Sequence, residues 1–121
     1  MIRARDKSDG EQVAIKYIRG ACDTLYLAKK TLREVTILGE LSKLDSNRHV
    51  TKMKKALYFK RKGEHHIFII MEDGGLDLKS LMDSSELMQF SEKRAKSLVY
   101  QLLCGLHYLH SAGVIHRDIK P

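Results

Sequence analysis

The run Val13-Ala14-Ile15-Lys16 places a lysine at the end of a short apolar stretch, where it could bind an anion. Side chains alternate between the two faces of a strand, so Ala14 and Lys16 would point the same way. Ala14 is small enough to leave space for a flat ring, and Lys16 would bring an ammonium group to the edge of that space. A half-buried edge strand has the same pattern, so the run needs a second residue to support it.

Glu34 is that residue, because it lies on the apolar face of a helix that the spacing predicts over residues 25–44. The other members of this face follow at intervals of three and four: Leu27, Thr31, Leu38 and Leu41. Burying an unpaired carboxylate costs on the order of several kcal/mol, so Glu34 needs a partner, and Lys16 is the obvious one. A rotated helix would instead leave Glu34 at the water boundary.

A third charged group lies in the last segment of the chain, residues 114–121, VIHRDIKP. An aspartate in a loop after a core helix can hold its carboxylate in a cleft, as Asp118 would. Arg117 could fix the loop, and Lys120 is placed to meet a phosphate oxygen. An ordinary charged loop would have the same composition.

Metal binding is a competing hypothesis for the histidines. The candidate set is His107, His110 and His116. The first two are three apart in a predicted helix, a spacing that can hold zinc, but no cysteine or acidic ligand completes a tetrahedron. His65 and His66 are adjacent in a predicted strand and would face opposite ways. We therefore expect no metal site among these residues.

The elements that must position these groups are two hairpins, each followed by a helix. Strands are predicted over residues 2–5, 12–18, 56–60 and 65–71. Turn residues join them at 7–10, which contains Asp-Gly, and at 61–64. Ser91 is a plausible N-cap for the last helix, and Gly113 a C-terminal stop. The apolar residues of that helix recur at helical spacing: Ala95, Leu98, Val99, Leu102, Leu103, Leu106 and Leu109.

Charge and composition describe one small domain that favours an anionic partner. The 121 residues contain 22 Lys plus Arg and 15 Asp plus Glu, a net charge of +7. A solvated basic surface would give the same balance. Nucleic-acid binding is suggested by the basic residues between positions 52 and 62, but stacking aromatics at regular spacing are lacking, and we expect no nucleic-acid partner.

The sequence also favours an intracellular protein, in the cytoplasm or the nucleus. The longest apolar run, residues 67–71, is too short to cross a bilayer, and the first residues lead into no signal core. From the short apolar run we expect no membrane partner. Cys22 and Cys104 have no metal-type spacing, so we expect two reduced thiols.

Four segments, in this order and with these gaps, resemble a eukaryotic protein kinase domain: VAIK, TLREVTIL, IIMEDGG and YQLLCGLHYLHSAGVIHRDIKP. The likeness is greatest to the mitogen-activated and cyclin-dependent kinase group, and Lys120 two residues after Asp118 is typical of serine/threonine kinases. The resemblance implies an α+β fold that covers part of a kinase domain. Residues 1–71 would form the small lobe, 72–77 the hinge and 78–121 the start of the large lobe.

The resemblance also implies a role for each site residue. Lys16 would hold the α and β phosphates of ATP and pair with Glu34, while Asp118 would accept the proton of a protein substrate's hydroxyl group and Lys120 would steady the γ-phosphate. The other implied ATP-binding residues are Ala14, the gatekeeper Met71, Glu72 and Gly74 through their backbone, and Asp77 toward the ribose.

The 121 residues depart from the family pattern at both ends. The Gly-rich loop, the metal-binding Asn and the D-F-G motif are not among them, so the Mg²⁺ ligands are expected beyond Pro121. The sequence thus predicts a truncated kinase domain that is inactive in isolation. The alternative is a non-catalytic module that docks on a kinase or its regulatory protein through an exposed stripe of Leu98, Leu102 and Leu109.

Overall fold

The computed structural model describes residues 1–44, 46–83 and 91–121. The chain divides into two compact units, Met1–Gly74 and Gly75–Pro121, and each is described by itself. The division falls inside the range 72–77 expected for a hinge.

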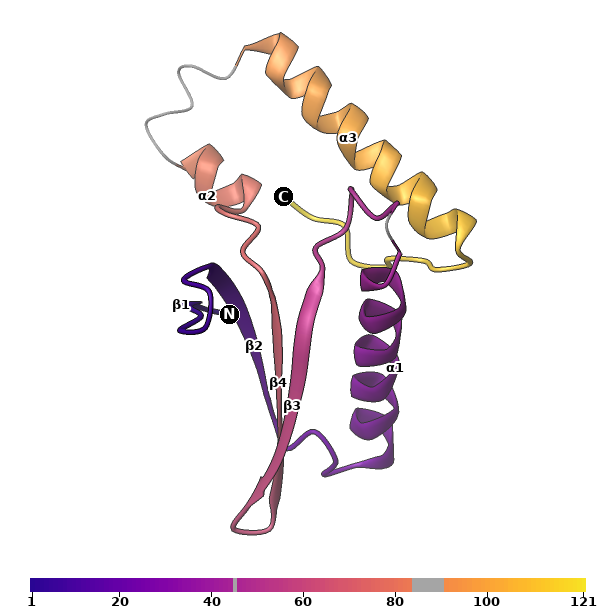
Figure 1. Ribbon diagram of the computed structural model, residues 1–121. Coiled ribbons are helices and arrows are strands. Elements are labelled where there is room, and N and C mark those ends of the chain that lie inside the picture. Colours follow the sequence, from indigo (N-terminus) through magenta and orange to yellow (C-terminus); the bar gives the residue numbers. More distant parts are fainter. Residues whose placement is uncertain (45, 84–90) are drawn as a thin grey trace. The chain divides into compact units, whose positions relative to one another are not determined.

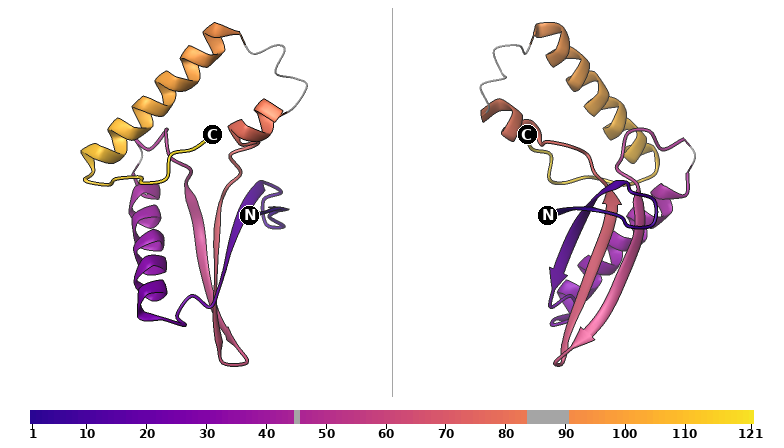
Figure 2. Two further views of the ribbon diagram at one scale, coloured as in Figure 1. Left: turned by 180° about the vertical axis from the view of Figure 1, so that it is seen from behind. Right: turned by 60° about the vertical axis from the view of Figure 1, so that its left-hand side comes forward.

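The first unit is a four-stranded antiparallel sheet with one helix on it (Figure 1). The strands lie in the order β1-β2-β4-β3. The helix α1 lies beside the strands in Figure 1 and behind them in the right-hand view of Figure 2, so it covers one face of the sheet. The bounds are β1 Ile2–Arg5, β2 Gln12–Arg19, α1 Leu25–Ser42, β3 Met53–Arg61 and β4 Glu64–Glu72.

The predicted hairpin of β3 and β4 forms, and its turn of two residues is shorter than the predicted range 61–64. Lys62 and Gly63 both have positive φ, 50° and 86°, the conformation of a type I′ turn, whose twist matches that of the strands. Strand β3 begins at Met53, earlier than the predicted residue 56. A register shift between Met53 and Lys55 interrupts the pattern there, so the first part of β3 lacks clean alternation.

The loop between β1 and β2 differs from the tight Asp-Gly turn that the sequence predicts. Only Gly10 has a positive φ, 76°. Two aspartates hold the loop by accepting backbone N–H groups two residues further on: Asp6 Oδ1 from Ser8 at 3.0 Å, and Asp9 Oδ1 from Glu11 at 2.9 Å. Side-chain oxygens thus replace part of the backbone bonding of a two-residue turn.

Helix α1 begins at a capped residue that the sequence analysis did not identify. The Thr24 hydroxyl oxygen accepts the backbone N–H of Leu27 at 3.1 Å, which satisfies one of the unpaired donors of the first turn. The helix ends at Ser42, before the predicted residue 44.

Polar bonds fix the end of α1 to the sheet. The Ser42 hydroxyl donates to the Leu38 carbonyl at 2.6 Å and accepts the backbone N–H of Met53 at 2.7 Å, which joins the helix to β3. Asn47 is 3% exposed, and its side-chain amide donates to the Leu41 carbonyl at 3.1 Å. These bonds satisfy groups that would otherwise be unpaired at the helix end.

The apolar core lies mainly in the first unit. Ile69, in the inner strand β4, is fully buried, and Thr31 and Leu41 are the buried residues of α1. The other buried apolar side chains of this unit are Val13, Ala14, Ala21, Ile70 and Met71. Buried residues on both faces of β4 match its near-continuous apolar sequence.

The second unit contains the helices α2, Leu78–Asp83, and α3, Glu92–Ser111. Helix α2 was not predicted from the sequence, and none of its six residues is buried. Asp77 caps it, since Oδ1 accepts the Ser80 N–H at 2.6 Å. No helix in the described part of the chain is long and apolar enough to cross a membrane.

Both predicted ends of α3 are confirmed. The Ser91 hydroxyl oxygen accepts the N–H of Arg94 at 3.3 Å. Gly113 has a positive φ of 71°. Its N–H donates to the His110 carbonyl, and the Val114 N–H donates to the Leu109 carbonyl, both at 2.9 Å. This pair of hydrogen bonds is a Schellman motif.

The predicted exposed stripe on α3 needs one correction. Leu98 and Leu102 are 40% and 45% exposed, but Leu109 is 7% exposed. Leu109 lies in the last helical turn. Its carbonyl accepts the backbone N–H of Val114, so the chain after the helix turns back toward it. The exposed apolar surface of α3 therefore ends before this turn.

Candidate nucleotide site and catalytic loop

Lys16 and Glu34 meet across the space between β2 and α1. Lys16 Nζ donates to Glu34 Oε1 at 2.5 Å. The Lys16 and Glu34 side chains are 41% and 29% exposed. Glu34 is therefore neither fully buried nor fully at the water boundary, the two alternatives that the sequence left open. The predicted pair forms, and it forms at the edge of the core.

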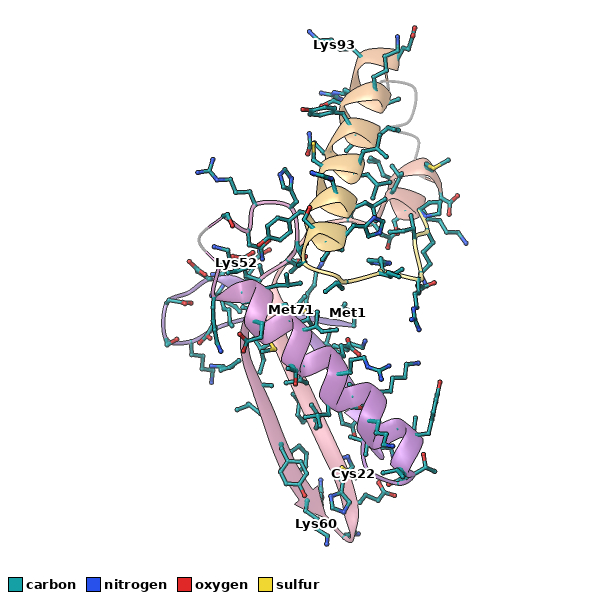
Figure 3. The ribbon with its side chains drawn as sticks, turned by 90° about the vertical axis from the view of Figure 1, so that its right-hand side faces the viewer. Met1, Cys22, Lys52, Lys60, Met71 and Lys93 are labelled. Carbon is teal, nitrogen blue, oxygen red and sulfur yellow. The ribbon has the colours of Figure 1, made fainter. Side chains whose placement is uncertain are left out.

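The sheet register explains why Lys16 points at the helix. Ala14 pairs with Met71 and Lys16 with Ile69, and residues directly opposite in an antiparallel pair share a face. Ala14 and Met71 are 7% and 8% exposed, and Ile69 is fully buried. The ammonium group thus stands at the end of a buried apolar row, as the strand alternation predicts. Figure 3 shows α1 in front of the strands, with Met71 labelled.

The geometry of this pair matters more than its contribution to stability. A partly exposed ion pair typically contributes about 0–1 kcal/mol, because water screens the charges and both side chains lose freedom. The pair does restrict where the Lys16 ammonium can lie. A cation held in this way beside an apolar surface can bind a phosphate group whose organic part packs on that surface.

The residues directly after Met71 form a hydrogen bond and an ion pair with other segments of the first unit. The N–H of Glu72 donates to the Lys52 carbonyl at 3.0 Å, so this N–H is already used within the protein. Asp73 pairs with Arg3, Oδ2 to Nε, at 3.3 Å. Gly74 is exposed, and a Cβ atom there would meet nothing within 4 Å.

The predicted catalytic residues of the second unit lie in one loop. Lys120 Nζ is 3.2 Å from Asp118 Oδ2, and both side chains are more than 70% exposed, at 71% and 73%. The Asp118 N–H donates to Nδ1 of His116 at 3.2 Å. Asp77, the residue expected at the ribose, accepts the Ser80 N–H, and this hydrogen bond lowers the pKa of its carboxyl group.

The backbone conformation of Arg117 was not predicted from the sequence. Its φ is 65°, the left-handed region that few residues other than glycine adopt. Such strain persists only where the surroundings enforce it, and it is common at functional sites. Nothing in the residue type signals it, because arginine has no preference for this conformation.

The remaining charged candidates do not form a separate site. Lys54 pairs with Asp9 and Glu11, and Lys55 with Asp6, so part of the basic run between residues 52 and 62 is neutralised. In residues 1–44, 46–83 and 91–121, no three side chains of His, Cys, Asp or Glu gather as a metal site would require. Cys22 and Cys104 are both unpaired.

Comparison with known proteins matches residues 1–121 to the protein kinase domain. Mitogen-activated protein kinase 13 of Pan troglodytes is 36% identical over 124 aligned residues, which cover 98% of this chain and 31% of that protein. The mitogen-activated protein kinase homolog MMK2 of Medicago sativa is 38% identical over 112 residues, 92% of this chain and 29% of that protein. The chain thus spans about three tenths of the length of these relatives.

The family match covers the Lys16–Glu34 pair, the sheet that presents it and the loop that contains Asp118. The order of the sequence segments and the observed strand-to-helix ion pair agree with it. This chain belongs to the protein kinase family.

Proposed function

We propose that this chain contributes the ATP-binding lysine and the proton-accepting aspartate of a protein serine/threonine kinase. In this proposal Lys16 binds the α and β phosphates, with Glu34 fixing its position. Ala14 and Met71 line the adenine pocket, the backbone of Glu72 and Gly74 binds the adenine edge, and Asp77 approaches the ribose.

Asp118 accepts the proton of the substrate hydroxyl group in the same proposal, and Lys120 steadies the γ-phosphate. The observation that carries it is the 2.5 Å contact of Lys16 with Glu34, which joins a strand to a helix at the edge of a buried apolar row. A fixed ammonium group beside a buried apolar row supports the binding of a nucleotide. Mg²⁺, which would neutralise phosphate charge, has no ligand set among the described residues.

Nucleotide binding tests this proposal directly. Titration of the purified 121-residue chain with a fluorescent ATP analogue should show saturable binding. Lys16→Met should weaken it about 10-fold or more, the effect of losing a charge-assisted contact. Lys29→Met is the matched control, because Lys29 is an exposed lysine of α1. Equal binding by the wild type and both variants would contradict the proposal.

Phosphoryl transfer is a separate question. Since transfer depends on charge neutralisation by metal ions, the isolated chain should give no metal-dependent labelling of a basic protein by labelled ATP. Labelling that Lys16→Met abolishes would show that the isolated chain is catalytically competent.

A second candidate function is a non-catalytic module that docks on a partner protein. The exposed apolar side chains of α3 favour it: Leu98, Val99, Tyr100, Leu102 and Leu103. Large exposed apolar surfaces are common at interaction sites. A Leu98→Asp, Leu102→Asp double variant should lose a specific kinase or regulator in a pull-down, and unchanged capture would exclude this use of α3.

A further inference from the structure

The face of the sheet that points away from α1 carries stacked rings. Because Lys16 points to α1, its neighbour Tyr17 must point to the opposite face. The ring centroids of Tyr17 and Phe68 are 4.8 Å apart, those of Phe68 and Phe59 5.4 Å, and those of Phe59 and His66 4.9 Å. Leu57 of β3 lies directly opposite Phe68 of β4, so its side chain shares this face with the rings. We call these five residues the outer aromatic face.

The outer aromatic face is both exposed and held in place. Tyr17, Leu57 and Phe59 are 43%, 50% and 39% exposed. His66 is buried beneath them, with its Nδ1 2.9 Å from the Tyr17 hydroxyl oxygen, so the rings are hydrogen-bonded as well as stacked. Rigid aromatic surfaces lose little conformational entropy on binding and are enriched at protein interfaces.

One end of this face is positively charged. Arg61 lies opposite Glu64 at the end of the β3–β4 hairpin, and Lys62 is in the turn. The Arg19 guanidinium donates hydrogen bonds to both carboxylate oxygens of Glu64, at 3.0 and 2.8 Å. Within the described residues, Arg61 and Lys62 therefore have no carboxylate partner. Figure 3 labels the neighbouring Lys60 at this end.

At the other end of the face, ion pairs bring carboxylates to the lysines of β3. The loop of residues 6–11 brings Asp6, Asp9 and Glu11 to Lys54 and Lys55, and every one of these side chains is in an ion pair. A ligand would therefore meet apolar side chains in the middle of the face and the cations Arg61 and Lys62 at the hairpin end.

We propose that the outer aromatic face binds an acidic amphipathic segment of another protein. Its apolar side chains would cover Tyr17, Leu57 and Phe59, and its carboxylates would lie at Arg61 and Lys62. Charge selects this partner, because complementary potentials favour association. A second copy of this chain has the same net charge of +7, and nucleic acid would find few unpaired cations beside the rings.

Selection of peptides from a random display library on the purified chain tests the proposal. The selected peptides should combine apolar residues with a net negative charge. A synthetic peptide of the selected sequence should bind about 10-fold more weakly to Leu57→Asp and to Arg61→Glu, which is typical of interface residues. Leu32→Asp is the control, because Leu32 is a 68% exposed leucine on α1.

A charge swap sharpens the test. Replacing the peptide's acidic residues by lysine should abolish binding to the wild type and restore part of it with Arg61→Glu. Circular dichroism should show that each variant is folded. Arg61→Glu decides the matter if Leu57→Asp unfolds the chain, because Arg61 is exposed at the hairpin end.

Several results would overturn the proposal. These are selected peptides without acidic bias, equal binding by Arg61→Glu and wild type, and equal loss in Leu32→Asp. A wild-type dimer in sedimentation that Leu57→Asp dissociates would assign the face to a second copy. Binding to phosphatidylserine vesicles that needs Arg61 but not Leu57 would assign the cations to a membrane surface.

Discussion

The two charged pairs that the kinase resemblance connects with catalysis are built differently. Lys16 and Glu34 are 18 positions apart and come from a strand and a helix, with side chains 41% and 29% exposed. Asp118 and Lys120 are two positions apart in one loop and are 73% and 71% exposed. The first pair exists only because α1 packs on the sheet, whereas the second needs only local loop geometry.

This difference shows that the two units depend on different kinds of interaction. In the first unit a buried core sets the distance between charged groups. In the second unit Leu109 is the buried apolar side chain of α3, and the ends of α2 and α3 are set by caps at Asp77, Ser91 and Gly113. Changes to the core should therefore affect the first pair, and changes to caps should affect the second unit.

The largest expected effect is from Ile69→Ala, at the fully buried position in β4. Removing a buried isoleucine to alanine costs about 2–5 kcal/mol, from lost burial and the cavity left behind. Urea unfolding followed by circular dichroism should show this loss. Ile119→Ala, at a 49% exposed position, should change the free energy of unfolding by less than about 0.5 kcal/mol. Equal effects would contradict the assignment of the core to the first unit.

Gly113→Ala should have a smaller effect, confined to the end of α3. The position has φ 71°, and a Cβ in the left-handed region costs about 1–2 kcal/mol. Amide hydrogen exchange should become faster in the last turn of α3 and stay unchanged in the sheet. Gly74→Ala is the control, because Gly74 is not among the positive-φ glycines and a Cβ there would meet nothing within 4 Å. Fast exchange in both variants would argue against a specific C-cap.

A titration of Asp6 probes the loop between β1 and β2. Hydrogen bonds from the Ser8 N–H and hydroxyl group lower the pKa of Asp6 from 3.8 to about 2. Because the folded pKa is depressed, the stabilisation is fully present above about pH 4 and is lost as the pH falls toward 2. Carboxyl-carbon NMR should show this pKa. Ser8→Ala should raise it only part of the way to 3.8, since the N–H bond remains; an unchanged value would exclude the hydroxyl contribution.

Much of this fold could be predicted from local sequence signals. Gly63 permits one of the two positive φ angles of the β3–β4 turn, and the Ser91 and Gly113 signals fix the ends of α3, so these features depend on short segments. Helix α2 was missed because it has no buried face to create a periodic pattern, although Asp77 with Ser80 three residues later has the form of a cap.

The candidate site was predictable in part. Strand alternation and the helix face were sufficient to expect Lys16 beside Glu34. The anchoring of α1 by Ser42 and Asn47 was not predictable, because it depends on where the chain returns to the sheet at Met53. The left-handed Arg117 and the burial of Leu109 likewise result from the path of the chain after α3.

The smallest expected effect is on stability in Lys120→Met. An ion pair between side chains more than 70% exposed contributes about 0–1 kcal/mol, because both groups are well hydrated when apart. Thermal unfolding should therefore match the wild type within about 0.5 kcal/mol, as most surface substitutions do. Lys16→Met should cost more, since it leaves the partly buried Glu34 without its ammonium partner. If Lys120→Met were the more destabilising of the two, the Asp118–Lys120 pair would be holding the loop together, and Lys120 would not be free to turn toward a phosphate.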